Sequence, residues 1–297
     1  MTFGNHKGAT SQPAMLKKIL SDEVTRGWQI PIPKKDLLEL PGCVMAPLNI
    51  TRQDTINKFG EIVPKDRLTH NQSMKWTYSN SSINSRVQDE KFPPCVYGHS
   101  LTRVFHHIVA LRIKYPTKRI FMAKYDWKSA YRRCQTDISF MLQQVTSYDD
   151  DIALIGCRFS FGGKPWPAQW SVISESTTDL VNDILSCDKW NRESLKSPYQ
   201  HLVPKQKEPS KSKLLPGLKL RIPITPEPRG KADVYIDDIF VSVADIGPNV
   251  GRASHATPLA IHVMGRPLDP ADPLPRDNLL SEPKLAAEGA MCEELLI

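Results

Sequence analysis

The strongest constraint on the fold comes from residues 231–245, KADVYIDDIFVSVAD, in which two adjacent carboxylates interrupt an apolar run. Short β-branched and aromatic stretches flank Asp237 and Asp238, which is the pattern of a tight β-hairpin with acids at its tip. Buried like charges without a partner are costly, so the pair lies either on a solvated turn or beside a bound cation. A second Tyr-x-Asp-Asp match, at residues 148–151, follows a polar stretch and is typical of a solvated loop.

A third carboxylate is expected close to this hairpin. Residues 120–125, IFMAKY, predict a buried strand that ends at Asp126, and a hairpin tip can present its acids to such a strand end. Three converging carboxylates would repel one another by several kcal/mol in a partly desolvated site, and a hard divalent cation such as Mg²⁺ removes that repulsion. Two cations held about 3.5–4 Å apart can clamp the attacking and leaving oxygens of a phosphoryl displacement.

The charge balance favours a polyanionic partner. The chain has 39 Lys and Arg against 32 Asp and Glu, a formal net charge of +7, which indicates nucleic acid first and an anionic membrane surface second. There is no apolar run long enough to span a bilayer, no start of signal-peptide type, and no Cys spacing of a zinc site. We therefore expect an intracellular protein, cytoplasmic or nuclear rather than secreted, that does not contact a membrane.

One helix is clearly predicted within residues 98–116, with Ser100 as its N-cap and Pro116 as its stop. At helical periodicity, His106 and His107 fall on the polar face and are predicted to be solvated side chains rather than ligands. The predicted apolar arc comprises Leu101, Val104, Phe105, Ile108 and Leu111.

The rest of the chain alternates between short elements and irregular segments. Residues 151–163 predict another strand, and residues 167–187 predict a helix with a proline in its first turn. Residues 1–92 predict loops and short strands. Between 188 and 231, alternating prolines and lysines indicate a flexible basic insertion. After residue 243 we expect loop followed by a weak helix.

Three motifs, in the order in which they occur along the chain, resemble those of reverse transcriptases of the retrotransposon type. DWKSAY supplies the family's strand-end Asp126, followed five residues later by Tyr131. FGGKPWP, at 161–167, supplies a Gly-containing loop that ends in Pro ahead of a helix, and YIDD, at 235–238, supplies the hairpin. Upstream, VPKDRLTHNQS, at 63–73, is similar to the fingers strand whose basic residue meets the incoming triphosphate.

The resemblance covers most of residues 45–243 and implies an α+β fold. It implies a polymerase palm, an antiparallel sheet backed by helices, together with a fingers subdomain. The divisions expected from it are an irregular N-terminal segment (1–44), a fingers-like region (45–119), a palm (120–243) interrupted by the insertion at 188–231, and a C-terminal loop and weak helix (244–297) truncated before a thumb.

The activity implied by the resemblance is that of an RNA-directed DNA polymerase. Such an enzyme performs template-directed deoxynucleotidyl transfer on an RNA or DNA template-primer, with deoxynucleoside triphosphates as substrates and two Mg²⁺ ions, replaceable by Mn²⁺, as cofactors. By this resemblance Asp126 and Asp237 would ligate both ions. Asp238 would lie beside them, and the carbonyl of Trp127 would be a further ligand.

The resemblance also implies a nucleotide site. Lys65 and Arg67 would neutralise the β- and γ-phosphates. Tyr131 would lie under the sugar and exclude a 2′-hydroxyl. Phe161 and Gly162 would pack on the nucleotide and the template, the glycine permitting close approach of the backbone.

Three departures from the family keep other interpretations open. The segment between the 161–167 loop and the hairpin is long, position 161 is Phe where many relatives have a polar residue, and no thumb follows, so we expect weak, distributive synthesis. The first alternative is a catalytically inactive nucleic-acid-binding remnant. The second is an interaction protein that uses the Pro-rich segment as a ligand for partner domains. The oligomeric state is left open.

Overall fold

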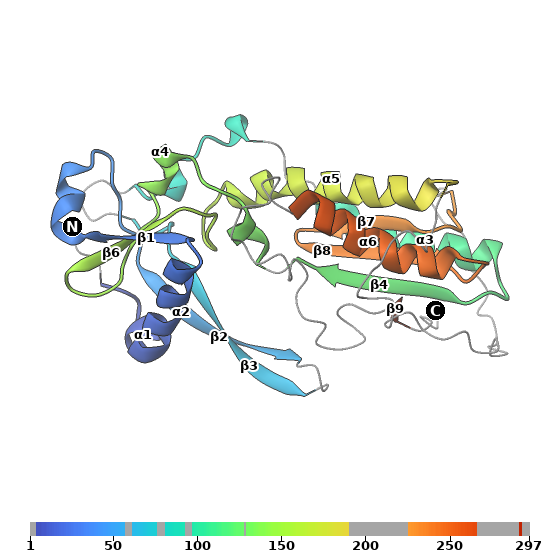
Figure 1. Ribbon diagram of the computed structural model, residues 1–297, viewed down its shortest axis with the longest axis horizontal. Coiled ribbons are helices and arrows are strands. Elements are labelled where there is room, and N and C mark those ends of the chain that lie inside the picture. The colour runs from blue at the N-terminus through green and yellow to red at the C-terminus, as the bar shows by residue number, and fades with distance from the viewer. Residues whose placement is uncertain are drawn as a thin grey trace. The chain divides into compact units, whose positions relative to one another are not determined.

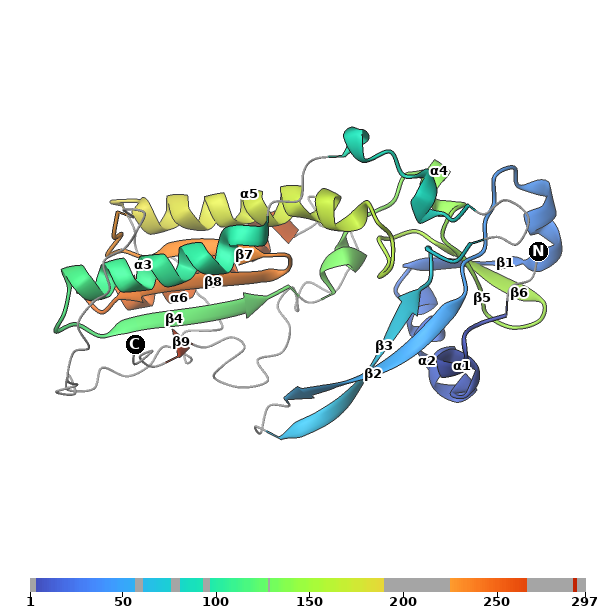
Figure 2. The same ribbon diagram turned by 180° about the vertical axis from the view of Figure 1, so that it is seen from behind.

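The computed structural model describes residues 4–56, 61–75, 81–92, 97–127, 129–189, 225–265 and 291–292. The chain divides into two compact units, which Figure 1 and Figure 2 show from opposite sides. Unit 1 comprises Met1–Thr55, Ile62–Pro94 and Ser129–Trp170, and unit 2 comprises Ile56–Glu61, Cys95–Lys128 and Ser171–Ile297. Most of the predicted insertion, residues 190–224, and most of the predicted C-terminal loop and weak helix lie outside the described residues.

Unit 1 contains two sheets with short helical elements around them. β1 (Gln29–Pro33), β6 (Ile152–Gly156) and β5 (Val145–Ser147) form an antiparallel sheet in that order, and β2 (Leu48–Ile56) pairs with β3 (Ile62–His70). The helical elements are α1 (Lys7–Thr10), α2 (Pro13–Thr25), η1 (Lys34–Glu39), η2 (Asn84–Arg86), η3 (Asp89–Lys91), η5 (Ala130–Arg133) and α4 (Ile138–Met141). A buried cluster joins α2 to strands of both sheets and includes Leu16, Leu20, Leu48, Ile50, Leu68 and Leu154.

Unit 2 is built on a four-stranded sheet with the order β7-β8-β4-β9. Its strands are β4 (Ile120–Asp126), β7 (Lys231–Tyr235), β8 (Asp238–Ala244) and β9 (Met291–Cys292). Its helical elements are η4 (Tyr97–His99), α3 (Ser100–Lys114), α5 (Trp166–Ser186, in unit 2 from Ser171) and α6 (Asn249–Gly265). α3 packs against β7 and β8, whereas α6 packs against β8 and β4, and the two views show these helices on opposite faces of the sheet.

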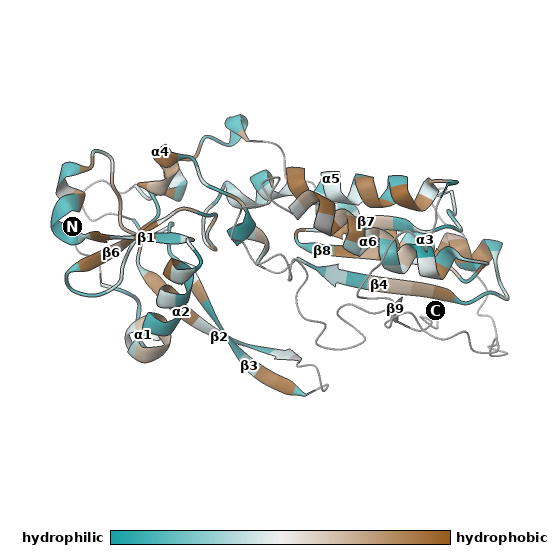
Figure 3. Cartoon of the chain, viewed as in Figure 1, coloured by the Kyte–Doolittle hydropathy of each residue, from teal (hydrophilic) through white to brown (hydrophobic). Residues whose placement is uncertain are grey.

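The hydrophobic pattern explains why the sheet of unit 2 forms. Figure 3 shows apolar residues concentrated along its strands, with β4 becoming hydrophilic toward its end at Asp126. Ile239, Val241 and Val243 of β8 are fully buried. Strands with buried faces have strongly specified registers, because a one-residue slip would move every apolar side chain to the other face.

The predicted fold class is confirmed: the protein is a mixed α/β structure in which antiparallel sheets are backed by helices. The strand predicted to end at Asp126, the hairpin at 231–245 and the helix predicted within 98–116 are present as β4, β7–β8 and α3, although α3 begins at Ser100 itself and its N-cap is His99. The helix predicted at 167–187 is α5, and the strand predicted at 151–163 is the shorter β6.

The predicted polar face of α3 is wrong at His107. His107 is 1% exposed, and its Nδ1 lies 2.6 Å from the hydroxyl oxygen of Ser242, while its Nε2 accepts a hydrogen bond from the Glu227 amide at 3.0 Å. Leu101 and Phe105, placed by periodicity on the apolar arc, are 42% and 51% exposed. Burial of His107 is tolerated because both ring nitrogens have partners that are distant in sequence, which periodicity cannot reveal.

Helix α2 corrects the prediction that the N-terminal segment is irregular. Pro13 occupies the first turn, where a missing backbone N–H leaves no hydrogen bond unmade. Leu16 and Leu20 are buried in the core of unit 1. Because short helices are marginal in isolation, it is this tertiary packing that stabilises α2.

Helix α6 occupies residues where loop is predicted. Pro258 lies inside it, although an interior proline removes a backbone donor and disfavours a helix. Packing against β8 and β4 outweighs that cost, since the small residues of α6 allow a close approach to the sheet. Its fully buried apolar residues are Ala253, Ala256, Ala260 and Ile261.

A candidate metal-binding carboxylate site

The β7–β8 hairpin positions two of the three predicted carboxylates. Tyr235 pairs with Asp238, so the loop between the strands consists of Ile236 and Asp237. The turn predicted at Asp237–Asp238 is therefore shifted by one residue, because Asp238 already pairs as the first residue of β8. Asp237 lies in the loop and Asp238 at the start of the strand.

The hairpin tip is strained at Ile236, which has a φ of 60°. Two-residue hairpin loops require positive φ at one or both central positions, and glycine or asparagine usually supplies it. A β-branched residue in this region is a true outlier that costs roughly 1–3 kcal/mol and persists only where the surrounding structure holds it. Here the flanking strand pairs hold the loop in place.

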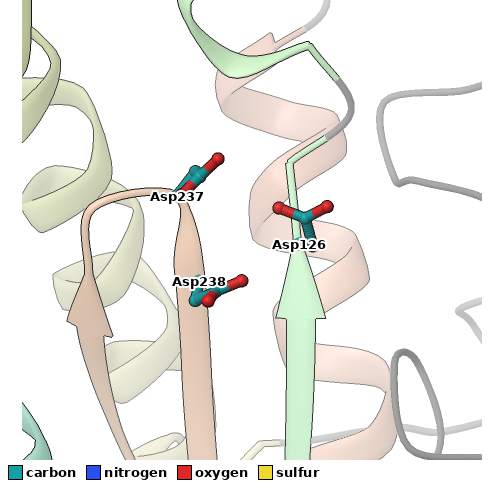
Figure 4. A group of neighbouring side chains, drawn as sticks. All are labelled: Asp126, Asp237 and Asp238. Atoms are coloured by element: carbon teal, nitrogen blue, oxygen red, sulfur yellow. The ribbon is translucent and has the colours of Figure 1, made fainter. Parts of the chain in front are cut away.

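Strand β4 brings the third carboxylate to the same place. β4 and β8 are antiparallel, and their register places Asp126 directly opposite Asp238. The backbone amide of Trp127 donates to the carbonyl of Asp237 at 3.2 Å, which ties the end of β4 to the hairpin loop. One carboxylate oxygen from each of Asp126, Asp237 and Asp238 lies within 4.8 Å of the others. Figure 4 shows the three side chains at the hairpin tip and the end of β4.

The electrostatics of this carboxylate cluster favour a bound cation. All three side chains are half-buried, so their mutual repulsion is only partly screened. Lys124 Nζ lies 3.1 Å from Asp238 Oδ2 and neutralises part of the charge. Lys124 precedes Asp126 by two residues on β4 and therefore points to the same face of the sheet. Lys124 can balance at most one of the three negative charges.

The donor set fits a hard divalent cation. Its atoms are carboxylate oxygens, the ligand type preferred by Mg²⁺, Mn²⁺ and Ca²⁺. Two ligand oxygens on one octahedral Mg²⁺ are roughly 3–4 Å apart, so the observed spread needs only small side-chain rotations to close on an ion. The residues present therefore fit the metal that the sequence predicts.

A second layer of contacts holds the hairpin on α3. Arg103 makes a two-pronged ion pair with Asp233 of β7, with 2.5 Å between Nε and Oδ2 and 2.7 Å between Nη2 and Oδ1. Burial and the nearby Asp233 raise the pKa of Glu175 on α5, while Arg103 opposes this rise. Sequence reasoning missed these residues and Lys124. Only Lys124 carried a signal, its two-residue spacing from Asp126 on a predicted strand.

The predicted nucleotide-site residues lie in unit 1, whereas the three carboxylates and Trp127 lie in unit 2. Tyr131 lies in η5, and its ring is 5.2 Å from that of Phe161 and 6.3 Å from that of Trp170. Lys65 and Arg67 have exposed side chains on β3. The structure thus brings Tyr131 together with Phe161.

Gly162 is required by its position. Its φ is 119°, a value that favours glycine, and an added Cβ would lie 1.8 Å from the carbonyl oxygen of His70. His70 in turn donates its amide to the carbonyl of Phe161 at 2.8 Å. The loop that carries Phe161 is therefore pinned against the end of β3, and any larger residue at 162 would displace it.

Unit 1 also contains a cavity of about 450 Å³ that sequence reasoning did not anticipate. Its wall includes the aromatic rings of Phe140 and Trp166 and the cationic side chains of Arg86 and Lys91, and none of the described residues that line it is acidic. Trp166 is fixed by stacking on Phe159, with 4.3 Å between ring centroids. Separately, none of the described helices is long and apolar enough to cross a bilayer.

No family model matches the chain, and no curated protein is found that matches its sequence. Among solved structures it is similar to a foamy viral protease-reverse transcriptase in complex with double-stranded DNA, with a TM-score of 0.49, 12% identity, and coverage of 89% of this chain and 31% of that chain. It is also similar to the native protease-reverse transcriptase of prototype foamy virus, with a TM-score of 0.47, 10% identity, and coverage of 89% and 24%. This chain spans less than a third of either solved chain.

Proposed function

We propose that this chain is a reverse transcriptase-like domain of retrotransposon type that performs template-directed deoxynucleotidyl transfer. The observation that carries the proposal is the convergence of Asp126 with the sequence-distant pair Asp237 and Asp238, to within 4.8 Å at the end of one sheet. Nucleotidyl transfer needs such a cluster, because two divalent ions must be held close together to act on both oxygens of the displacement.

The roles of the chain's own residues follow from this proposal. Asp126, Asp237 and Asp238 hold two Mg²⁺ ions, with the carbonyl of Trp127 as a further ligand. When bound, the ions stabilise the attacking 3′-oxygen and the charge that develops on the leaving pyrophosphate. Lys124 pairs with Asp238 and so moderates the charge of the site.

The nucleotide-binding residues implied by the family resemblance keep their roles in this proposal. Lys65 and Arg67 neutralise the triphosphate, because its oxygens accept charge-assisted hydrogen bonds from such cations. The ring of Tyr131 lies under the sugar and leaves no room for a 2′-hydroxyl. Phe161 and Gly162 pack on the nucleotide and the template.

Primer extension tests the proposal. The assay supplies an RNA template, a DNA primer, deoxynucleoside triphosphates and Mg²⁺, and compares the wild-type chain with Asp237→Asn. We expect the variant to lose at least roughly a hundredfold in rate, since it removes a charged ligand that acts in the transition state. The matched control is Asp150→Asn, in the solvated YDDD loop, which should extend like the wild type. Equal extension by Asp237→Asn would end the assignment.

A second candidate, a nucleic-acid-binding protein without catalysis, is favoured by the cavity of unit 1. Aromatic walls can stack a base, and Arg86 and Lys91 can meet a phosphate. This candidate predicts binding of single-stranded nucleic acid in the presence of EDTA that is unchanged by Asp237→Asn. Mg²⁺-dependent incorporation of nucleotides would exclude it.

A further inference from the structure

Arg132, the residue next to Tyr131, is anchored in a buried polar network. Arg132 is 6% exposed, and its Nη2 donates to Glu23 Oε1 on α2 at 2.6 Å. The same guanidinium donates to the carbonyl of Phe159 and contacts His70 Nε2, both at 3.4 Å. A buried cation is stabilised by the acceptors that meet its donors, and these contacts determine its position.

Glu23 is the charged partner that completes this anchor. It is 7% exposed, and its second carboxylate oxygen accepts a hydrogen bond from Gln29 Nε2. His70, which also touches the guanidinium, is neutral and adds no second positive charge, because burial and Arg132 lower its pKa to about 3. The charge of Arg132 is therefore balanced by Glu23.

The same network reaches the partner ring of Tyr131. The carbonyl of Phe159 accepts from Arg132, and the carbonyl of Phe161, two residues later, accepts from the His70 amide at 2.8 Å. The rings of Tyr131 and Phe161 are 5.2 Å apart. A displacement of Arg132 would therefore shift Tyr131, its neighbour in η5, relative to Phe161, whose segment the guanidinium contacts at the Phe159 carbonyl.

Local strain makes the anchor necessary. Ser129, which precedes η5, has a φ of 55°, in the left-handed region. A serine there costs free energy, and the conformation persists only where tertiary contacts impose it. The contacts of Arg132, three residues further on, supply such a constraint on η5.

We propose that Glu23 is a positioning residue that, through its buried ion pair with Arg132, holds Tyr131 against Phe161 and so sets how strictly a deoxyribose is selected over a ribose. The inference rests on the proposed function. It gives a role to the N-terminal segment, which lies outside the region of family resemblance at 45–243. Glu23 acts through another residue and does not itself touch the substrate.

The alternative role of the pair is purely structural, and the two roles can be separated. Removing one partner of a buried ion pair leaves an uncompensated charge and destabilises a protein, whereas replacing both partners with apolar residues of similar volume is often neutral. A double variant, Glu23→Leu with Arg132→Met, should therefore restore thermal stability that Glu23→Gln alone loses. The double variant still lacks the polar contacts that locate η5.

The experiment compares wild type, Glu23→Gln, the double variant and a matched control. The control replaces the partly buried pair of unit 2, as Arg119→Met with Asp245→Leu. The readouts are the melting temperature and the ratio of kcat/KM for a deoxynucleotide to that for the matching ribonucleotide. We expect the double variant to melt near the wild type and to lose about tenfold or more of this ratio, with the control unchanged. Wild-type discrimination by the double variant would overturn the proposal.

A second measurement separates this inference from the proposed function. 3-Fluorotyrosine is placed at position 131 alone, and its ¹⁹F resonance is recorded without metal or nucleotide. We expect the resonance of the double variant to shift or broaden, because the ring loses its fixed contact with Phe161, and the resonance of the control to stay in place. An unshifted resonance in the double variant contradicts the positioning role, whether or not the chain synthesises DNA.

Discussion

At the scale of single residues, the chemistry of the carboxylate cluster is set by charge. Asp126, Asp237 and Asp238 concentrate negative charge at a half-buried site. Lys124 is held beside this site by its ion pair with Asp238. A lysine beside a metal site competes with the metal, because both are attracted by the same carboxylates. Its contribution can therefore be measured through metal affinity.

Lys124→Met should bind Mn²⁺ more tightly than the wild-type chain. Removing one positive charge near the cluster favours the divalent ion, and a partly exposed site makes the gain modest, roughly threefold to tenfold in Kd. Isothermal titration calorimetry at low salt measures this directly. Lys118→Met, at an exposed turn of the same unit, is the control and should leave Kd unchanged. Weaker binding by Lys124→Met would mean that the lysine organises the site rather than competing with the ion.

Tyr131→Val should admit ribonucleotides. The smaller side chain removes the ring that, in the proposed function, blocks the 2′-hydroxyl, and we expect discrimination to fall by about tenfold or more. Single-nucleotide incorporation with matched deoxy- and ribonucleotides is the measurement, and Tyr148→Val in the unit 1 loop is the control. Unchanged sugar selectivity would remove Tyr131 from the nucleotide site.

At the scale of elements, the contact between α3 and β8 depends on a neutral histidine. His107 is held between the Ser242 hydroxyl and the Glu227 amide. Burial, with a smaller contribution from Lys231, lowers its pKa from 6.5 to about 4. Below pH 6.5, the pKa of this histidine in the unfolded chain, the unfolded chain binds a proton that the folded chain does not. The free energy of unfolding therefore falls as the pH drops from 6.5 toward 4.

His107→Gln should flatten this acid dependence. The pKa difference corresponds to about 3 kcal/mol that is lost by pH 4, and the variant has no such proton to bind. Urea unfolding between pH 4 and pH 7 gives the slopes to compare. His106→Gln on the same helix is the matched control and should keep the wild-type slope. Parallel curves for His107→Gln and the wild type would show that another group accounts for the dependence.

At the scale of the whole molecule, the basic insertion leaves and re-enters unit 2 at one place. Arg229 pairs with Asp188 at 2.6 Å and donates to the carbonyl of Ser186 at 2.7 Å. Asn249 of α6 also donates to the carbonyl of Pro228 at 2.7 Å. The described ends of the insertion are thus joined by contacts that do not depend on what lies between them.

Replacing residues 190–224 with a six-residue Gly/Ser linker should leave unit 2 folded. The entropic cost of closing a loop is smaller for a shorter loop, so we expect an unchanged or slightly higher melting temperature. Mn²⁺ affinity should also be unchanged, because the carboxylates are set by strand register. Differential scanning calorimetry and metal titration are the measurements. A loss of cooperative unfolding would show that the insertion is part of the core.

Local patterning in the chain was enough to predict the strand ending at Asp126, the 231–245 hairpin and the α3 and α5 helices. The reason is that alternation, helical spacing and turn chemistry act over a few neighbouring residues. The same signals failed for α2 and α6, whose helices are stabilised by packing on distant elements.

The remaining features of the site depend on contacts between residues that are distant in sequence. The opposition of Asp126 and Asp238, the Lys124–Asp238 pair, the burial of His107 and the Glu23–Arg132 anchor each join residues that come together only when strands and helices pack. A sequence pattern indicates which residues favour a strand or a polar face. It does not specify the register between strands or the partner of a buried side chain, because these depend on the free energy of the complete folded structure.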